Sequence, residues 1–295
     1  MDIRLAPDQA RVVLRPLGFA SDEEYAKIIR RVLSLPEQEV RRLLDQVLEE
    51  FSSRHRQVSK RLSDRFHELE RFLPPDGGVS EARELLIGSY FLYEYSAESA
   101  ALFNPSILPH PDQSGLSKGS LRFLLSLRST GEGHVSSISF RSGVIDARNG
   151  ITVDPASRFL TGPELIENPT YHKALFGRKV AEMGLAGEWT QRGMGRLGDC
   201  FTLQELKQGL TQAVQETARG SEIGDDNTAK GLWLLALSNY EIRFPQDQDL
   251  SERIIFPVTP IQSNGLEDVR LTAHRDEAGK TVYYATYTAY DGRNV

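Results

Sequence analysis

The spacing of apolar residues changes repeatedly along the chain, and these changes limit the folds open to it. Over residues 21–72 apolar side chains recur at every third or fourth position, which is typical of amphipathic helices. The stretches 121–129 and 135–145 instead have strand composition and are separated from their neighbours by segments rich in glycine and serine. Helical spacing returns over residues 168–244, and strands resume at 253–260. The sequence therefore predicts an α+β chain in which a block of helices interrupts a region of antiparallel strands.

This order of elements predicts a helical N-terminal segment at residues 1–87 and a β domain at 88–295, with a helical insertion at about 164–245. Two parts of the β domain resemble each other. Each opens with a polar residue, Asn104 or Asp268, runs through a short strand, turns, and enters a longer apolar strand. The first copy is followed by a third strand, whereas the sequence ends before a counterpart follows the second. The chain therefore looks truncated inside a repeat unit, and a closed β-propeller would need at least four such units.

The charge of the chain excludes some classes of partner. Its 295 residues carry 35 Lys and Arg against 41 Asp and Glu, so the net charge is −6 and no general attraction to nucleic acid or to an anionic membrane is expected. No apolar run is long enough to cross a bilayer, and the N-terminus lacks the pattern of a secretory signal. The expected location is the cytoplasm, and a neutral or polar small substrate fits best.

Cysteine and histidine usage gives no sign of a metal centre. The single cysteine, Cys200, excludes an intrachain disulfide and a cysteine-based zinc cluster, and we expect it to be an inert thiol in the core. His110 and His172 have no partners at metal-ligand spacing. No metal site and no organic cofactor is therefore expected.

Two adjacent carboxylates, Glu267 and Asp268, follow a glycine turn and begin a predicted strand in the segment "GLEDVR". Strand alternation would place Glu267 and Val269 on one face and Asp268 and Arg270 on the other. An arginine two positions away can hold a carboxylate in its ionised form. Considered alone, the pair is compatible with an exposed loop or with the mouth of a pocket where a proton is transferred.

Several segments together resemble glycoside hydrolase family 130, the mannoside phosphorylases and related β-mannosidases. The family signature Gly-x-Glu-Asp-Pro-Arg, followed by a tyrosine-rich strand, is similar to "GLEDVRL" and "VYYATYTAYDG" in this chain. The segments "FNPS", "LSLRST" and "SSISFRSGVID" resemble other strands of the family. The resemblance covers roughly residues 90–153 and 254–292, and the helical segments match a longer branch of the family. Val269 stands where the family usually has proline.

The resemblance implies a five-bladed β-propeller, of which this sequence contains the first blades. Its axial pocket would bind a β-linked mannoside and cleave it with inversion. Asp268 matches the general acid, which protonates the glycosidic oxygen through a sugar hydroxyl, and Glu267 would support the pocket. Asn104 and Arg128 match sugar-binding positions of the first blade. The remaining substrate-binding candidates are Arg270, beside the acid pair, and Tyr290, one of several tyrosines that either pack in a sheet or stack on a sugar ring.

The sequence leaves the reaction type open. Phosphorolysis would use inorganic phosphate as a cosubstrate, whereas hydrolysis in an inverting enzyme needs a second carboxylate that activates water. The alternative from another class is a non-catalytic carbohydrate-binding or interaction protein built on an incomplete propeller. The charged helices from Glu37 to Glu70 are expected to present a solvated face, and the alternative is a contact in a homo-oligomer.

Overall fold

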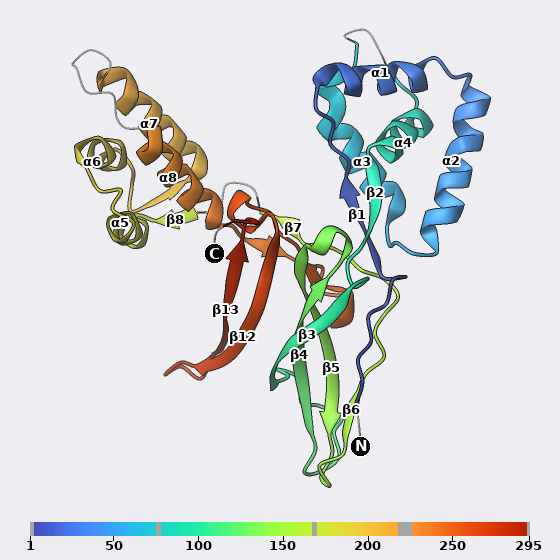
Figure 1. Cartoon of the computed structure of the whole chain (residues 1–295), viewed down its shortest axis with the longest axis vertical. Helices are drawn as coiled ribbons and strands as arrows, with labels where there is room; N and C mark the ends of the chain where they lie inside the picture. Colours follow the sequence, from blue (N-terminus) through green and yellow to red (C-terminus); the bar gives the residue numbers. More distant parts are fainter. Residues whose placement is uncertain (1–2, 75–77, 167–169, 218–225, 294–295) are drawn as a thin grey trace. The chain divides into compact units, whose positions relative to one another are not determined.

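The computed structural model describes residues 3–74, 78–166, 170–217 and 226–293. The chain divides into two compact units. Unit 1 contains Met1–Gly162, Asp247–Pro257 and Asn264–Thr288, and unit 2 contains Pro163–Gln246, Val258–Ser263 and Ala289–Val295. The expected α+β class is confirmed, and none of the sheets formed by the described strands closes on itself (Figure 1). No helix in the described ranges combines the length and the apolar character needed to cross a membrane.

Unit 1 begins with a small helical bundle. Glu24 accepts a hydrogen bond from the backbone N–H of Ser21 at 3.3 Å and so caps the first helix, as its sequence favours. The ring of Tyr25 stacks between Phe72 and Phe91, with ring centroids 4.6 and 5.4 Å away, and this stack closes the core of the bundle. The helices are α1 (Asp22–Leu33), α2 (Glu37–Ser52), α3 (Val58–Leu69) and α4 (Glu81–Tyr90), with a short 3-10 turn η1 (Glu70–Phe72).

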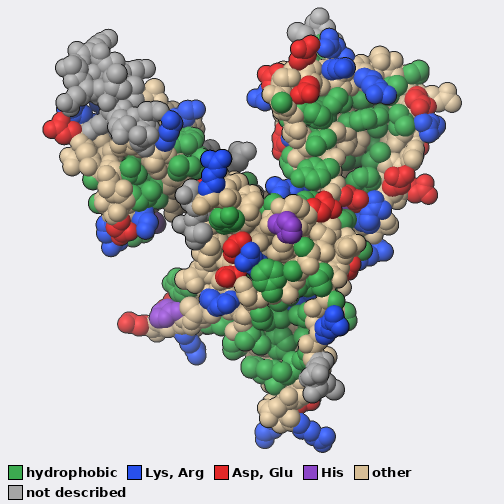
Figure 2. Space-filling view, in the orientation of Figure 1, with side chains coloured by type: hydrophobic (Ala, Val, Ile, Leu, Met, Phe, Trp, Pro, Cys, Tyr) green, Lys and Arg blue, Asp and Glu red, His purple; other side chains and the backbone are tan. Residues whose placement is uncertain are grey.

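A two-stranded ladder connects this bundle with the sheet of unit 1. In the ladder β1 (Val12–Pro16) pairs with β2 (Leu92–Ser96) in antiparallel register. The sheet has the order β13-β12-β5-β4-β3, and β6 and β11 also pair with β5. Its strands are β3 (Ala101–Pro109), β4 (Leu121–Thr130), β5 (Ser136–Ile145), β6 (Ile151–Val153), β11 (Ile254–Ile255), β12 (Gly265–Arg275) and β13 (Thr281–Tyr290), with the 3-10 turns η2 (Glu132–His134) and η3 (Leu250–Glu252). Figure 2 shows hydrophobic side chains gathered over β3, β4 and β5.

The sheet consists of two strand sets that meet over a narrow contact. Strands β3, β4 and β5 form a long antiparallel meander, in which every residue from Leu121 to Thr130 of β4 pairs with β5. The hairpin β12–β13 joins this meander through one parallel register pair, Gly265 with Ser136, at the beginning of both strands. A Cβ on Gly265 would lie 2.8 Å from the Ser136 side chain, so only glycine permits this approach. The starts of β5 and β12 are therefore held side by side.

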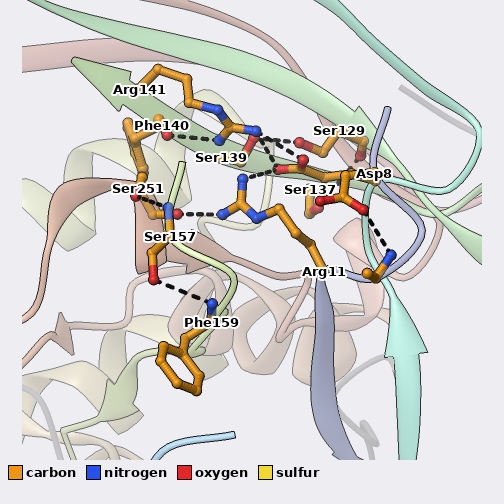
Figure 3. Close-up of polar contacts among 12 residues, drawn as sticks. Asp8, Arg11, Ser129, Ser137, Ser139, Phe140, Arg141, Ser157, Phe159 and Ser251 are labelled. Carbon is orange, nitrogen blue, oxygen red and sulfur yellow. Dashed lines mark hydrogen bonds and ion pairs between the residues drawn. The ribbon is translucent and has the colours of Figure 1, made fainter. Parts of the chain in front are cut away.

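One face of the meander carries a buried ion cluster, which consists of Arg11, Glu98 and Arg141 (Figure 3). Glu98 is 0 % exposed and accepts hydrogen bonds from Arg11 Nη1 at 3.0 Å and from Arg141 Nη2 at 2.8 and 3.0 Å. Arg11 also donates to the carbonyl oxygen of Ser251. Burial lowers the pKa of Arg11 to about 10, which still leaves the guanidinium charged at neutral pH. Through these bonds Arg11, the residue before β1, is connected with β5 and with η3.

Unit 2 consists of helices and two short antiparallel strand pairs, β7 with β10 and β8 with β9. Its core is formed by aromatic and aliphatic side chains, among them Tyr171, Phe176 and Phe201. The elements are β7 (Glu164–Leu165), β8 (Thr170–His172), α5 (Lys173–Glu182), α6 (Glu188–Gly195), β9 (Cys200–Thr202), α7 (Leu203–Thr217), α8 (Asp226–Ser238), β10 (Ile242–Arg243) and the 3-10 turn η4 (Pro260–Gln262).

The expectation of a core thiol at Cys200 is wrong. Cys200 begins β9, a three-residue strand at the surface, and is exposed. Its neighbour Phe201 points the other way and is buried in the core of unit 2, because successive residues of a strand face opposite sides. The Cys200 sulfur lies 3.4 Å from His172 Nδ1, on the paired strand.

Candidate functional site

Four of the predicted site residues meet where β3, β4, β5 and β12 come together in unit 1. We call this set of side chains the Asp268 cluster, and it consists of Asn104 on β3, Arg128 on β4, Ser136 on β5, and Glu267 and Asp268 on β12. The register of β4 and β5 explains the position of the cluster. Arg128 pairs with Ile138, and Ser136 with Thr130, so these four side chains face one side of the sheet. Arg141, which belongs to the buried ion cluster, faces the other side.

Two residues of the cluster have a left-handed backbone. Asn104 has φ 50° and Asp268 has φ 53°, a region that residues other than glycine adopt rarely, although Asn and Asp tolerate it best. At Asn104 the pairing of β3 with β4 shifts between Phe103 and Ser106, as in a β-bulge. Such bulges often redirect a side chain at functional sites. The two irregular residues also bond to each other, which makes this part of the sheet a candidate site.

The left-handed turn at Asp268 breaks the alternation expected from the sequence. Glu267 and Asp268 both contact Arg128, whereas strict alternation would place them on opposite faces. Val269 is buried in an apolar cluster with Ile138 and Leu266. The prediction that the adjacent acids diverge is therefore wrong, because the local backbone at Asp268 is not extended.

The carboxylate of Asp268 has one bonded and one open oxygen. Oδ1 accepts a hydrogen bond from Asn104 Nδ2 at 2.5 Å and from Arg128 Nη1 at 3.2 Å. Oδ2 has no hydrogen bond with the described part of the chain, and the side chain is 44 % exposed. One oxygen thus fixes the orientation of the carboxylate, while the other can accept a hydrogen bond from a ligand hydroxyl.

Arg128 is held on several sides. Its Nη2 donates to Glu267 Oε1, and its Nε donates to Ser136 Oγ at 3.0 Å. The guanidinium carbon lies 4.8 Å from the centre of the Phe103 ring, which is within the range of a cation–π contact. Arg128 therefore joins the two carboxylates of β12 and has little freedom to turn.

The electrostatics of the cluster favour an ionised Asp268. The hydrogen bond from Asn104 lowers the pKa of Asp268 most, burial acts in the opposite direction, and Arg128 and Arg270 lower the pKa further. The carboxylate is consequently ionised at neutral pH in this arrangement. It is a strong hydrogen-bond acceptor there, and it carries a proton only in acidic solution or when a ligand changes its surroundings.

The other two predicted site residues have different positions. Arg270 is exposed, and its Nη1 donates to the carbonyl oxygens of Val269 at 3.0 Å and Asn104 at 3.3 Å, so it contacts the β3 backbone at the bulge rather than the Asp268 carboxylate. Tyr290 is the last residue of β13, is partly buried, and belongs to unit 2. It is not among the side chains that the hydrogen bonds of the Asp268 cluster join.

Three residues of this region, Phe103, Ser106 and Ser136, carry no site signal in the sequence. Ser136 lies in the serine run "SSIS", whose composition predicts only part of a strand. The Oγ of Ser106 accepts a hydrogen bond from the backbone N–H of Leu271 at 2.9 Å and so connects β3 with β12 next to the bulge. The only signal in the sequence was the polarity of these serines in otherwise apolar strands.

A cavity of about 540 Å³ lies in unit 2, lined by residues of β8, α5 and the end of α8, among them Tyr171, Phe176 and Leu235. None of the predicted site residues lines it. Within the described ranges, no group of three or more His, Cys, Asp or Glu side chains is arranged to hold a metal ion.

Comparisons of the chain with protein-family models, with curated proteins and with solved structures found no match. The relationship with glycoside hydrolase family 130 therefore stays a prediction from the motifs quoted above.

Proposed function

We propose that the protein is a glycoside hydrolase or glycoside phosphorylase that cleaves β-linked mannosides with inversion, and that Asp268 is its proton donor. The observation that supports this proposal best is the convergence of Asn104, Arg128 and Asp268. Asn104 and Asp268 are 164 positions apart in the chain, and their side chains are hydrogen-bonded around one carboxylate with an open oxygen. Directional donors and an exposed carboxylate are the groups that recognise sugar hydroxyls.

The chemistry of glycoside cleavage assigns a role to each group. Bond breaking builds positive charge on the sugar ring, and the leaving oxygen needs a proton. A protonated Asp268 would supply that proton from Oδ2 through a sugar hydroxyl, while Asn104 and Arg128 orient the sugar. Because the pKa of Asp268 is lowered, activity should be greatest on the acid side of neutrality. Inorganic phosphate would attack as cosubstrate in a phosphorylase, and water in a hydrolase.

The proposal also includes the five-bladed propeller. Strands β3, β4 and β5 would form most of one blade, and the hairpin β12–β13 would begin the next. The single parallel pair between Gly265 and Ser136 is compatible with two blades that meet at the inner ends of their strands. In this arrangement the Asp268 cluster would face the axial pocket. The cytoplasm stays the proposed location.

A second candidate function is non-catalytic carbohydrate binding. The lowered pKa and the exposure of Asp268 favour it, since an ionised, accessible carboxylate binds hydroxyl groups without transferring a proton. The two functions predict the same ligand class and differ in turnover.

The test uses the protein expressed from its complete gene, incubated with mannobioses with and without phosphate, with release of mannose or mannose 1-phosphate as the readout. Asp268→Asn should lower turnover by about 100-fold or more while mannobiose still binds, because a positioned acid typically contributes a factor of this size. Glu277→Gln, at an exposed position of the β12–β13 turn, is the matched control and should leave turnover unchanged.

Binding without turnover in the unmodified protein would favour the carbohydrate-binding function. If the protein neither binds nor cleaves mannosides, both candidate functions are refuted. Calorimetry on the same samples measures binding independently of turnover.

A further inference from the structure

Arg128 donates hydrogen bonds to two carboxylates, and this sharing limits the number of hydrogen bonds that it forms with Asp268. The guanidinium presents Nη2 to Glu267 and Nη1 to Asp268, so the two acids share one cation. We propose that Glu267 is a positioning residue that acts through Arg128, by limiting the hold of the guanidinium on Asp268 so that Asp268 keeps an open oxygen and can take up a proton.

The geometry restricts how Arg128 can pair. Arginine and carboxylate commonly form two parallel hydrogen bonds, one from each of two guanidinium nitrogens. In this cluster Nη2 is engaged by Glu267 and Nε by Ser136, while the ring of Phe103 covers one face of the guanidinium. Only Nη1 reaches Asp268, and it reaches Oδ1 alone. A two-point pairing that would also engage Oδ2 is thereby prevented.

Ser136 helps to hold Glu267 and Arg128 together. Its Oγ lies 3.4 Å from Glu267 Oε1 and 3.0 Å from Arg128 Nε, so the serine contacts both partners of the ion pair. Glu267 is also less exposed than Asp268, with side-chain exposures of 18 % and 44 %. The more buried acid therefore anchors the arginine, and the more accessible acid faces the ligand.

The polar and charged groups around Asp268 lie on β3, β4 and β12. Asn104 on β3 donates to Oδ1, Arg128 on β4 supplies a positive charge, and on β12 Arg270 adds a positive and Glu267 a negative charge. Removing the negative charge of Glu267 leaves Arg128 with one acidic partner. Asp268 would then be harder to protonate, and its second oxygen could be drawn into the ion pair.

The titration of Asp268 tests this inference directly and needs no substrate. We expect Glu267→Gln to lower the pKa of Asp268 by about half a unit or more, as measured by carboxyl carbon NMR on the complete protein. An unchanged or raised pKa of Asp268 would overturn the inference. The matched control is Glu277→Gln, at an exposed position of the β12–β13 turn, which should leave the titration of Asp268 unchanged.

If Glu267→Gln does not fold, Glu267→Asp supplies the second comparison. This change keeps the negative charge but shortens the side chain, which weakens the hold on Arg128 and leaves the guanidinium freer to pair with Asp268. We expect a smaller fall than for Glu267→Gln. No fall in this variant would equally contradict a role that acts through Arg128.

The kinetic consequence rests on the proposed function. In a mannoside-cleaving enzyme, Glu267→Gln should move the acid optimum of kcat/KM to lower pH and leave KM almost unchanged. A rise in KM without a shift of the pH profile would instead make Glu267 a sugar contact and overturn the inference. Loss of turnover in Asp268→Asn tests the proposed function separately, so the two ideas can fail independently.

Discussion

Removal of the charge from Glu98 should destabilise unit 1 more than any exposed charge change. Glu98 is 0 % exposed and accepts three hydrogen bonds from two guanidinium groups that are themselves almost fully buried. Glu98→Gln keeps the volume but leaves Arg11 and Arg141 without a counter-charge in the cluster. Breaking a buried ion pair by removing one partner typically costs about 3–5 kcal/mol. That is a large share of the roughly 5–15 kcal/mol that stabilises an ordinary folded domain.

Urea unfolding followed by far-UV circular dichroism measures this loss as a fall in the transition midpoint at constant slope. Glu39→Gln is the control, because Glu39 forms an exposed ion pair with Arg42 on α2 and its loss should leave the midpoint unchanged. A loss smaller than about 1 kcal/mol for Glu98→Gln would refute the reasoning, since it would show that the two buried arginines do not need this carboxylate.

Three further predictions concern acid stability, helix packing and the site. Burial lowers the pKa of His55 below 6.5, so the folded protein should lose stability as the pH falls below about 6.5 and the unfolded chain binds a proton at this histidine. His55→Gln should make the urea midpoint depend less on pH in that range, and an unchanged pH dependence would contradict this. Gly88→Ala should lower the free energy of unfolding by about 1–3 kcal/mol in the same assay, because the added Cβ would lie 2.0 Å from the carbonyl oxygen of Leu62 on α3. The control Gly162→Ala, whose Cβ would have no atom within 4 Å, should be nearly neutral. Asn104→Ala should raise the pKa of Asp268 in an NMR titration, because it removes the largest influence that lowers it, and an unaltered pKa would show that the bond is unimportant.

The helices and long strands could be predicted from the sequence because their apolar residues repeat at the spacing of each element. Helices α2 and α3 lie within the predicted helical stretch at 21–72, and β4 and β5 match the predicted strands at 121–129 and 135–145. The division at residue 87 and the propeller arrangement stay predictions.

The parts that the sequence could not reveal depend on backbone irregularities and long-range contacts. No local pattern in the sequence shows that the backbone at Asp268 is left-handed. The φ angle of this one residue decides whether Glu267 and Asp268 share a face of the sheet. The partners of Glu98 come from residues 87 and 43 positions away, so the ion cluster leaves no periodic trace. The convergence of Asn104 and Arg128 on Asp268 was expected only from the resemblance to a family, and the Ser136 contact was not expected at all.

A crystal structure of the protein with a bound β-linked mannobiose tests the proposed role of the Asp268 cluster most directly. We predict that a sugar hydroxyl lies within hydrogen-bond distance of Asp268 Oδ2 and that Asn104 and Arg128 surround the same sugar. A mannobiose bound elsewhere, with Asp268 turned away from Asn104 and Arg128, would contradict both the binding site and the proton donor proposed for it.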